Sequence, residues 1–126
     1  MKILVFSVSV LMFLVAGCVH TPVQPSDARV TLGPGLGSIV YVTSVRCARN
    51  QAGYCLFQAN VVNNTNRQVR LEYKVQWLDE AGMEIESVLS TWQPLAVQPA
   101  EIKGLSAVSP VKEAVDFRFY ARPFGR

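Results

Sequence analysis

The 126-residue sequence predicts an all-β fold, a small antiparallel sandwich of two sheets with about six to seven strands. Three observations predict it. Short runs of β-branched and aromatic residues alternate with polar residues, which is the period of a half-buried strand. Clusters of Gly, Pro, Asn and Asp separate these runs and are typical of turns. No run carries the three- and four-residue spacing of an amphipathic helix.

The first half of the domain contains three predicted strands. Residues 38–45 are β-branched and aromatic, and residues 54–63 alternate between apolar and polar side chains. After the turn-forming NNTNR of residues 63–67, apolar residues occupy every odd position of 69–77 and polar or charged residues every even position. This last strand should therefore turn its odd positions to the core and its even positions to solvent.

The second half repeats this alternation less regularly. After a turn at 79–82, residues 83–93 begin with alternation that then fades, and PLAVQP at 94–99 is expected to break the ladder because proline donates no hydrogen bond. Residues 101–109 and 114–122 are the last two predicted strands. Six strands joined by turns, with no helix between them, indicate a sandwich of immunoglobulin-like character.

The N-terminal residues predict where the protein is located in the cell and how it is anchored. Fifteen uncharged, mostly apolar residues, 3–17, follow Lys2, and Cys18 comes directly after them to give LVAGC at 14–18. The run is shorter than the roughly 20 residues of a membrane-spanning helix and fits a secretory signal peptide of residues 1–17. Its end resembles the bacterial lipobox, which implies cleavage before Cys18 and a lipid on that residue. An ordinary secretory signal or a buried helix with a chance cysteine is the alternative. In enterobacterial lipoproteins, aspartate directly after the lipidated cysteine retains the protein in the inner membrane. This chain has Val19 at that position, which implies transport to the outer membrane, where the protein would face the periplasm.

The remaining chain divides into a linker, a domain and a tail. Residues 18–37 are rich in proline and glycine and are expected to form a flexible tether. Residues 38–122 form the predicted domain, and 123–126 a C-terminal tail. A domain of this size buries a modest core, so a covalent staple would stabilise it.

Cys47 and Cys55 are the candidate staple. If Cys18 carries a lipid, these two remain as a pair in an oxidising compartment. They flank the polar loop ARNQAGY, so a disulfide would close a short hairpin and contribute roughly 2–3 kcal/mol. The alternative is a redox or metal-binding pair, which a C-x₇-C spacing without a neighbouring histidine supports poorly.

The segment NVVNNTNRQVRLEYKVQWLDEAGMEI at 60–85, with the lipobox and the terminal DFRFYAR, resembles the YcfL-like family of small bacterial lipoproteins. The resemblance covers residues 38–122 and the signal. It implies an immunoglobulin-like β-sandwich and supplies neither an established biochemical function nor catalytic residues. The cysteine pair and its loop have no place in the general pattern of that family.

Residues for catalysis or metal binding are sparse. The single histidine, His20, stands beside the expected lipid site, so the domain has no His-dependent triad. The four carboxylates of 79–86 lack the spacing of a calcium loop and fit a solvated hairpin turn. The formal net charge falls from +3 to +2 when Lys2 leaves with the signal, which gives no basis for nucleic-acid binding. We therefore expect no catalytic residue, no metal and no cofactor.

The two tryptophans differ in their surroundings. Trp77 lies on the apolar face of its strand and is expected in the core. Trp92 stands in STWQP, where the alternation fails, and is a candidate for a binding surface, with burial in the core as the alternative.

The sequence thus favours a non-enzymatic, lipid-anchored periplasmic module that binds another envelope protein through an edge strand or a strand-end loop. The alternative is a glycan- or peptidoglycan-binding or hydrolytic lipoprotein, which needs a concave pocket lined by Trp92 and carboxylates. A structural spacer without a specific partner is the third possibility.

Overall fold

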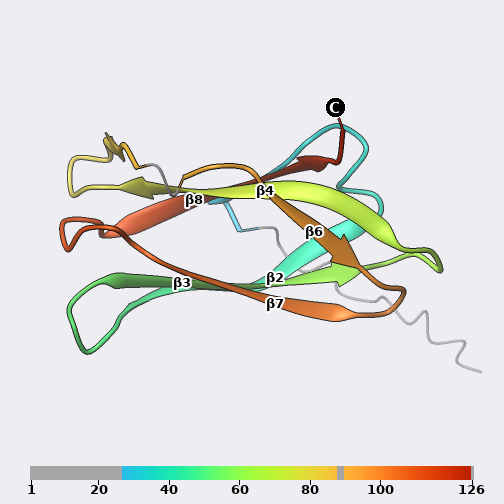
Figure 1. Cartoon of the computed structure of the whole chain (residues 1–126), viewed down its shortest axis with the longest axis horizontal. Coiled ribbons are helices and arrows are strands. Elements are labelled where there is room, and N and C mark those ends of the chain that lie inside the picture. Colours follow the sequence, from blue (N-terminus) through green and yellow to red (C-terminus); the bar gives the residue numbers. More distant parts are fainter. Residues whose placement is uncertain (1–26, 88–89, 126) are drawn as a thin grey trace, which may run out of the picture.

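Two β-sheets face each other across an apolar core in the computed structural model, which describes residues 27–87 and 90–125 (Figure 1). The larger sheet has the order β1–β8–β4–β5, with β6 also paired to β4, and the smaller sheet has the order β2–β3–β7. The strands are β1 (Val30–Leu32), β2 (Val40–Arg49), β3 (Cys55–Asn63), β4 (Val69–Leu78), β5 (Glu84–Ile85), β6 (Gln93–Val97), β7 (Ile102–Val108) and β8 (Asp116–Pro123). The predicted all-β sandwich is confirmed.

β4 is the central strand of the larger sheet. It pairs with β8 on one side, and with β5 and β6 on the other, in antiparallel register. Four of its five odd positions are buried, and the fifth, Tyr73, is half-buried and stacks on Phe119 at 5.7 Å between ring centroids. The predicted inward orientation of the odd positions is therefore confirmed, including that of Trp77, which is 2% exposed.

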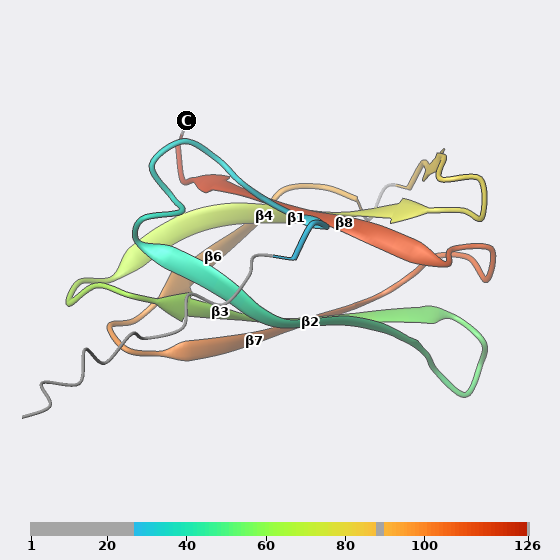
Figure 2. The ribbon, with the colours of Figure 1, turned by 180° about the vertical axis from the view of Figure 1, so that it is seen from behind.

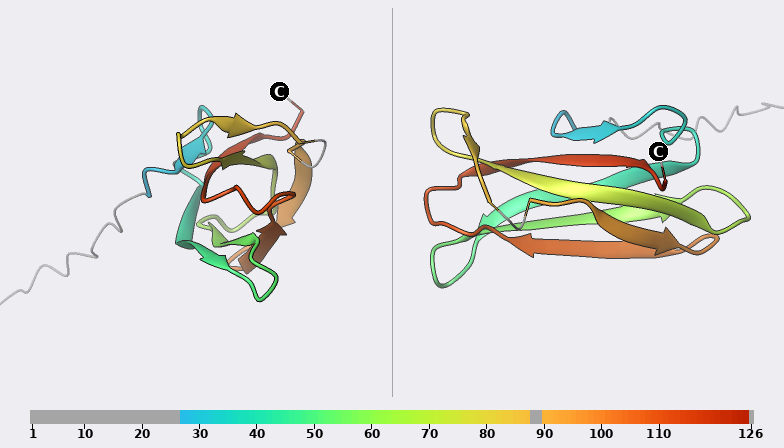
Figure 3. Two further views of the ribbon diagram at one scale, coloured as in Figure 1. Left: turned by 90° about the vertical axis from the view of Figure 1, so that its left-hand side faces the viewer. Right: turned by 45° about the horizontal axis from the view of Figure 1, so that its top comes forward.

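The core residues lie between the two layers of strands, which Figure 3 (left) shows end-on. Its centre is an aromatic cluster in which the Phe57 ring meets Phe117 edge to face at 4.6 Å and stacks on Phe119 at 5.6 Å. All three phenylalanines are fully buried. Aromatic rings of this size supply a large share of the buried apolar area of a small domain, and their edge-to-face and stacked contacts add to it.

The expected tether of residues 18–37 is wrong for the part that the structure describes. Val30–Leu32 form β1, which pairs in parallel with β8 (Figure 2). Leu36 is 1% exposed and belongs to the core cluster, and its carbonyl accepts a 3.0 Å hydrogen bond from the Val40 N–H. A three-residue strand is too short to show a period, and the prolines and glycines around it hide it in the sequence. The folded domain therefore begins before residue 38.

Two further boundaries differ from the prediction. Residues 94–99 were expected to break the ladder, yet Gln93–Val97 form β6, with Pro94 opposite Glu72 of β4. β6 lies at an edge of the sheet, where a missing N–H leaves no partner unsatisfied. The expected tail also starts too early, because Pro123 belongs to β8 and the Phe124 N–H donates to the Arg70 carbonyl at 3.3 Å.

The predicted signal peptide of residues 1–17, the predicted lipid site Cys18, and His20 lie outside the described residues. Within 27–87 and 90–125, no helix is long and apolar enough to cross a membrane.

Candidate functional site

The side of the larger sheet that points away from the core carries charged and aromatic side chains. It is formed by the even positions of β4, by the residues of β8 opposite them, and by the residue before β6. Antiparallel pairing sets Glu72 opposite Arg122, Lys74 opposite Tyr120, and Gln76 opposite Arg118. We call this surface the outer face; it comprises Arg70, Glu72, Lys74, Gln76, Trp92, Arg118, Tyr120 and Arg122.

Trp92 lies at the middle of the outer face. It directly precedes β6, whose first residue, Gln93, pairs with Tyr73, so its indole ring extends over β4. The ring centroid is 3.8 Å from Cζ of Arg122 and 4.9 Å from Nζ of Lys74, within the range of cation–π attraction. Trp92 is half-buried and is not part of the core cluster, so burial in the core, the alternative left open by the sequence, is wrong.

Hydrogen bonds and a second ring contact fix the side chains around Trp92. Nε of Arg122 donates to Oε2 of Glu72 at 2.8 Å, which holds the guanidinium group between the carboxylate and the indole. The Tyr120 hydroxyl donates to Oε1 of Gln76 at 3.2 Å, and Nζ of Lys74 lies 5.5 Å from the Tyr120 ring centroid. These contacts pre-organise the face and so reduce the conformational entropy that binding would cost.

The outer face is strongly cationic. Arg70, Lys74, Arg118 and Arg122 lie on it with one carboxylate, Glu72, which is already paired with Arg122. No ion pair among the described residues involves the other three cations. The positive charge ends at the row of Leu78, where Asp116 and Glu84 are the cross-strand neighbours.

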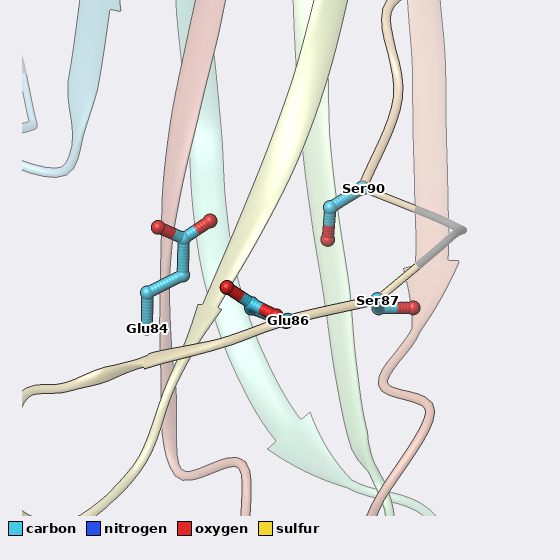
Figure 4. Close-up of a pocket in the computed structure, with 4 residues that line it drawn as sticks. All are labelled: Glu84, Glu86, Ser87 and Ser90. Carbon is cyan, nitrogen blue, oxygen red and sulfur yellow. The ribbon is translucent and has the colours of Figure 1, made fainter.

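Two hollows lie elsewhere on the domain. One, of about 430 Å³, is lined by Glu84, Glu86, Ser87 and Ser90, which belong to β5 and to the chain that follows it (Figure 4). The other, of about 400 Å³, lies on the exposed side of the smaller sheet and includes Asn60 and Gly104. Trp92 is not among the described residues that line these two hollows. In the part of the chain that the structure describes, no three His, Cys, Asp or Glu residues lie close enough to hold a metal ion.

Cys47 and Cys55 form a disulfide, as the sequence predicts. Their Cα atoms are 6.1 Å apart at the end of the β2–β3 hairpin, and Cys55 is buried. A hydrogen bond from the Tyr54 N–H to the Asn50 side-chain oxygen, 3.0 Å long, closes the connecting turn. Gly53 supplies the positive φ of 86° that this turn requires. The bridge therefore joins two strands of the smaller sheet and leaves the outer face of the larger sheet untouched.

A family model described as "Protein of unknown function (DUF1425)" matches residues 28–123. The chain belongs to this family. Two solved structures resemble the domain: a DUF1425 family member from Shewanella sp. pv-4, at 26% identity and a TM-score of 0.62, and Campylobacter jejuni cj0090, at 26% identity and a TM-score of 0.66. The first alignment covers 66% of this chain and 76% of the other, and the second 77% and 99%. No curated protein matches the chain.

The DUF1425 match begins at residue 28, within the segment that was expected to be a tether, and this segment supplies a contact that sequence reasoning missed. The Arg29 guanidinium lies 4.6 Å from the Phe117 ring centroid and bonds both carboxylate oxygens of Asp27 at 3.0 Å. These hydrogen bonds hold the pKa of Asp27 below its usual value. Arg29 thus covers the Phe117 ring of the aromatic core, and its Nη2 donates to the Val45 carbonyl of β2 at 3.4 Å.

Proposed function

We propose that this DUF1425 protein is a non-enzymatic lipoprotein of the YcfL-like type, anchored by a lipid on Cys18 in the bacterial outer membrane, and that it binds another envelope protein in the periplasm. The outer face of the larger sheet is the contact surface. The observation that carries the proposal is the half-exposed Trp92, held between Arg122 and Lys74. Trp, Tyr and Arg are the residues most enriched at the energetic centres of protein interfaces.

The outer face is favoured as the contact surface over the edge strands β2 and β7 of the smaller sheet. β2 carries a bulge between Thr43 and Arg46, with Ser44 at a φ of 54°, which interrupts the row of groups that an added strand would bind. On β7, Lys103 lies opposite the inward-facing Val61. A bulge and an inward-pointing lysine are both devices that protect sheet edges from pairing.

Binding of a protein partner is also favoured over the glycan-binding or hydrolytic alternative. That alternative requires Trp92 and carboxylates in one concavity, whereas the hollow that contains Glu84 and Glu86 is not lined by Trp92. Both glutamates are exposed and lie two residues apart on one short stretch of chain (Figure 4), whereas the two carboxylates of a glycosidase flank the bound sugar.

Site-specific crosslinking in intact cells tests the proposal. A photoreactive amino acid at the exposed Thr91 should yield a discrete adduct with an envelope protein, whereas one at Ala48, exposed on the smaller sheet, should not. Trp92→Ala should abolish the Thr91 adduct and cost only about 1 kcal/mol of stability, because an exposed cation–π contact contributes little more. The matched control Tyr41→Ala removes a half-exposed aromatic from the smaller sheet and should keep the adduct.

Two outcomes would contradict this proposal. A Trp92→Ala variant that melts like the parent and gives the same adducts would leave Trp92 without a role. A variant that loses about 3–5 kcal/mol, as buried large aromatics do, would show that any lost adduct reflects lost folding.

The anchor is tested separately. Cys18→Ala should abolish labelling by a radioactive fatty acid and release the protein from the membrane fraction or leave it unprocessed. Unchanged fractionation, with no lipid label lost, would contradict the proposed lipid on Cys18.

A further inference from the structure

We infer that the outer face recognises an extended, acidic segment of its protein partner, with carboxylates at alternate positions. This inference rests on the proposed function and names the chemistry of the partner. It follows from the arrangement of the cations on β4 and β8.

The cations of the outer face are distributed one to a row. Arg70 and Lys74 lie on β4, four residues apart, and Arg122 and Arg118 lie on β8 in the rows of Glu72 and Gln76. The four successive rows therefore present a cation alternately from β4 and from β8. Rows two residues apart along a strand are separated by about 6.6 Å. An extended peptide repeats its side chains on one side with the same period, so carboxylates at alternate residues match these cations.

The charges of the face are available to such a segment. Arg70 and Arg118 are exposed, and neither they nor Lys74 form an ion pair among the described residues. Arg122 donates from its Nε to Glu72, and its other guanidinium nitrogens form no ion pair within residues 27–87 and 90–125. An acidic partner therefore gains charge–charge attraction without breaking an existing pair.

An acidic protein fits this surface better than an anionic membrane. Faces that bind membranes insert apolar side chains into the lipid. Here the rings of Trp92 and Tyr120 are in contact with the cations Arg122 and Lys74. The carboxylates of Asp116 and Glu84 at the end of the face would also be repelled by an anionic bilayer. A cationic strip two strands wide that ends in carboxylates instead favours a narrow, extended partner.

Peptide binding to the full-length lipidated protein, held in a neutral detergent, tests the inference by fluorescence anisotropy. The probe is a labelled ten-residue peptide of alternating Glu and Ser. Two comparison peptides keep its length: one groups the same five glutamates in a block, and the other replaces Glu by Gln. The alternating peptide should bind several-fold more tightly than the block peptide, and its affinity should fall steeply as the salt concentration is raised. The Gln peptide should not bind.

Matched charge variants locate the binding. Arg118→Gln should lower the affinity for the alternating peptide about two- to fivefold, which is the effect expected from the loss of one exposed ion pair. Arg46→Gln removes the same charge from the exposed side of the smaller sheet and should leave the affinity unchanged. Equal weakening by both variants would mean that only net charge matters. Equal affinity for the alternating and block peptides would show that the spacing of the carboxylates is not recognised. Binding of the protein to phosphatidylglycerol vesicles, with no affinity for any of the peptides, would favour a membrane. Each of these three results overturns the inference.

The Thr91 crosslink separates failure of this inference from failure of the proposed function. If the adduct forms, depends on Trp92 and survives both Arg118→Gln and 0.5 M salt, the protein binds a partner that is not acidic. If the parent gives no adduct, the proposed function itself fails, whatever the peptides do.

Discussion

The Leu36→Ala substitution tests whether the segment before β2 belongs to the folded domain. Leu36 is 1% exposed, so truncation removes apolar atoms from the core and leaves a cavity. Substitutions of this kind cost about 2.7–5 kcal/mol. A domain of roughly 100 residues has a total stability of about 5–15 kcal/mol, and its midpoint falls about 4–8 °C for each kcal/mol lost. A loss of about 3 kcal/mol should therefore lower the midpoint by about 12–24 °C.

Thermal and urea unfolding of the purified protein, followed by circular dichroism, measures this effect. Thr31→Ala is the matched control, because Thr31 is an exposed residue of β1 and its truncation should change stability by no more than about 0.5 kcal/mol. If Leu36→Ala and Thr31→Ala unfolded alike, residues 27–37 would be a tether in solution and the assignment of β1 to the sheet would be wrong.

Three other perturbations have defined outcomes. Reduction of the Cys47–Cys55 disulfide, which spans a separation of 8 residues, should cost about 2.5 kcal/mol in the chain-entropy model, and mass spectrometry of the non-reduced protein should show two hydrogens lost and no alkylatable thiol at these positions. Val75→Asp should prevent folding or destabilise it by several kcal/mol, because it buries a carboxylate without a partner, whereas a soluble variant of parental stability would reverse the face assignment of β4. The lowered pKa of Asp27 means that its pairing with Arg29 stabilises the fold above the ordinary aspartate pKa of about 3.9 and is lost as the pH falls through the folded-state pKa. Asp27→Asn should therefore lower the urea midpoint near pH 7 by a small amount, since the pair is partly exposed, and converge with the parent below about pH 3.

Local patterning was enough to predict the long strands. The alternation of β4 is readable because nine consecutive positions obey one period, and it identifies Trp77 as a core residue. The cysteine pair was predictable because both residues flank one short turn. β1 and β6 were missed because they contain three and five residues and adjoin proline or glycine. Their strand character depends on pairing with β8 and β4, and no local signal records that pairing.

The candidate site was predictable only in part for the same reason. The sequence singled out Trp92 because the alternation fails there. Its two cationic contacts, Lys74 and Arg122, are 18 and 30 residues away along the chain and meet it only when β6 and β8 flank β4. One signal was available: basic residues recur on the solvent positions of both long strands, as Arg70 and Lys74 on β4 and as Arg118 and Arg122 on β8.

The outer face has a rigid support, and this determines how its mutations should behave. Directly beneath it, the Tyr73 ring stacks on Phe119, and Phe119 stacks on Phe57 of the opposite sheet. The spacing of the cations is set by the register of β4 and β8, and therefore by this core, rather than by the exposed side chains themselves. Changes in the core should consequently alter stability and binding together. Changes at Trp92 or Arg118 should alter binding while the fold persists, because a site on paired strands requires little ordering when a partner binds.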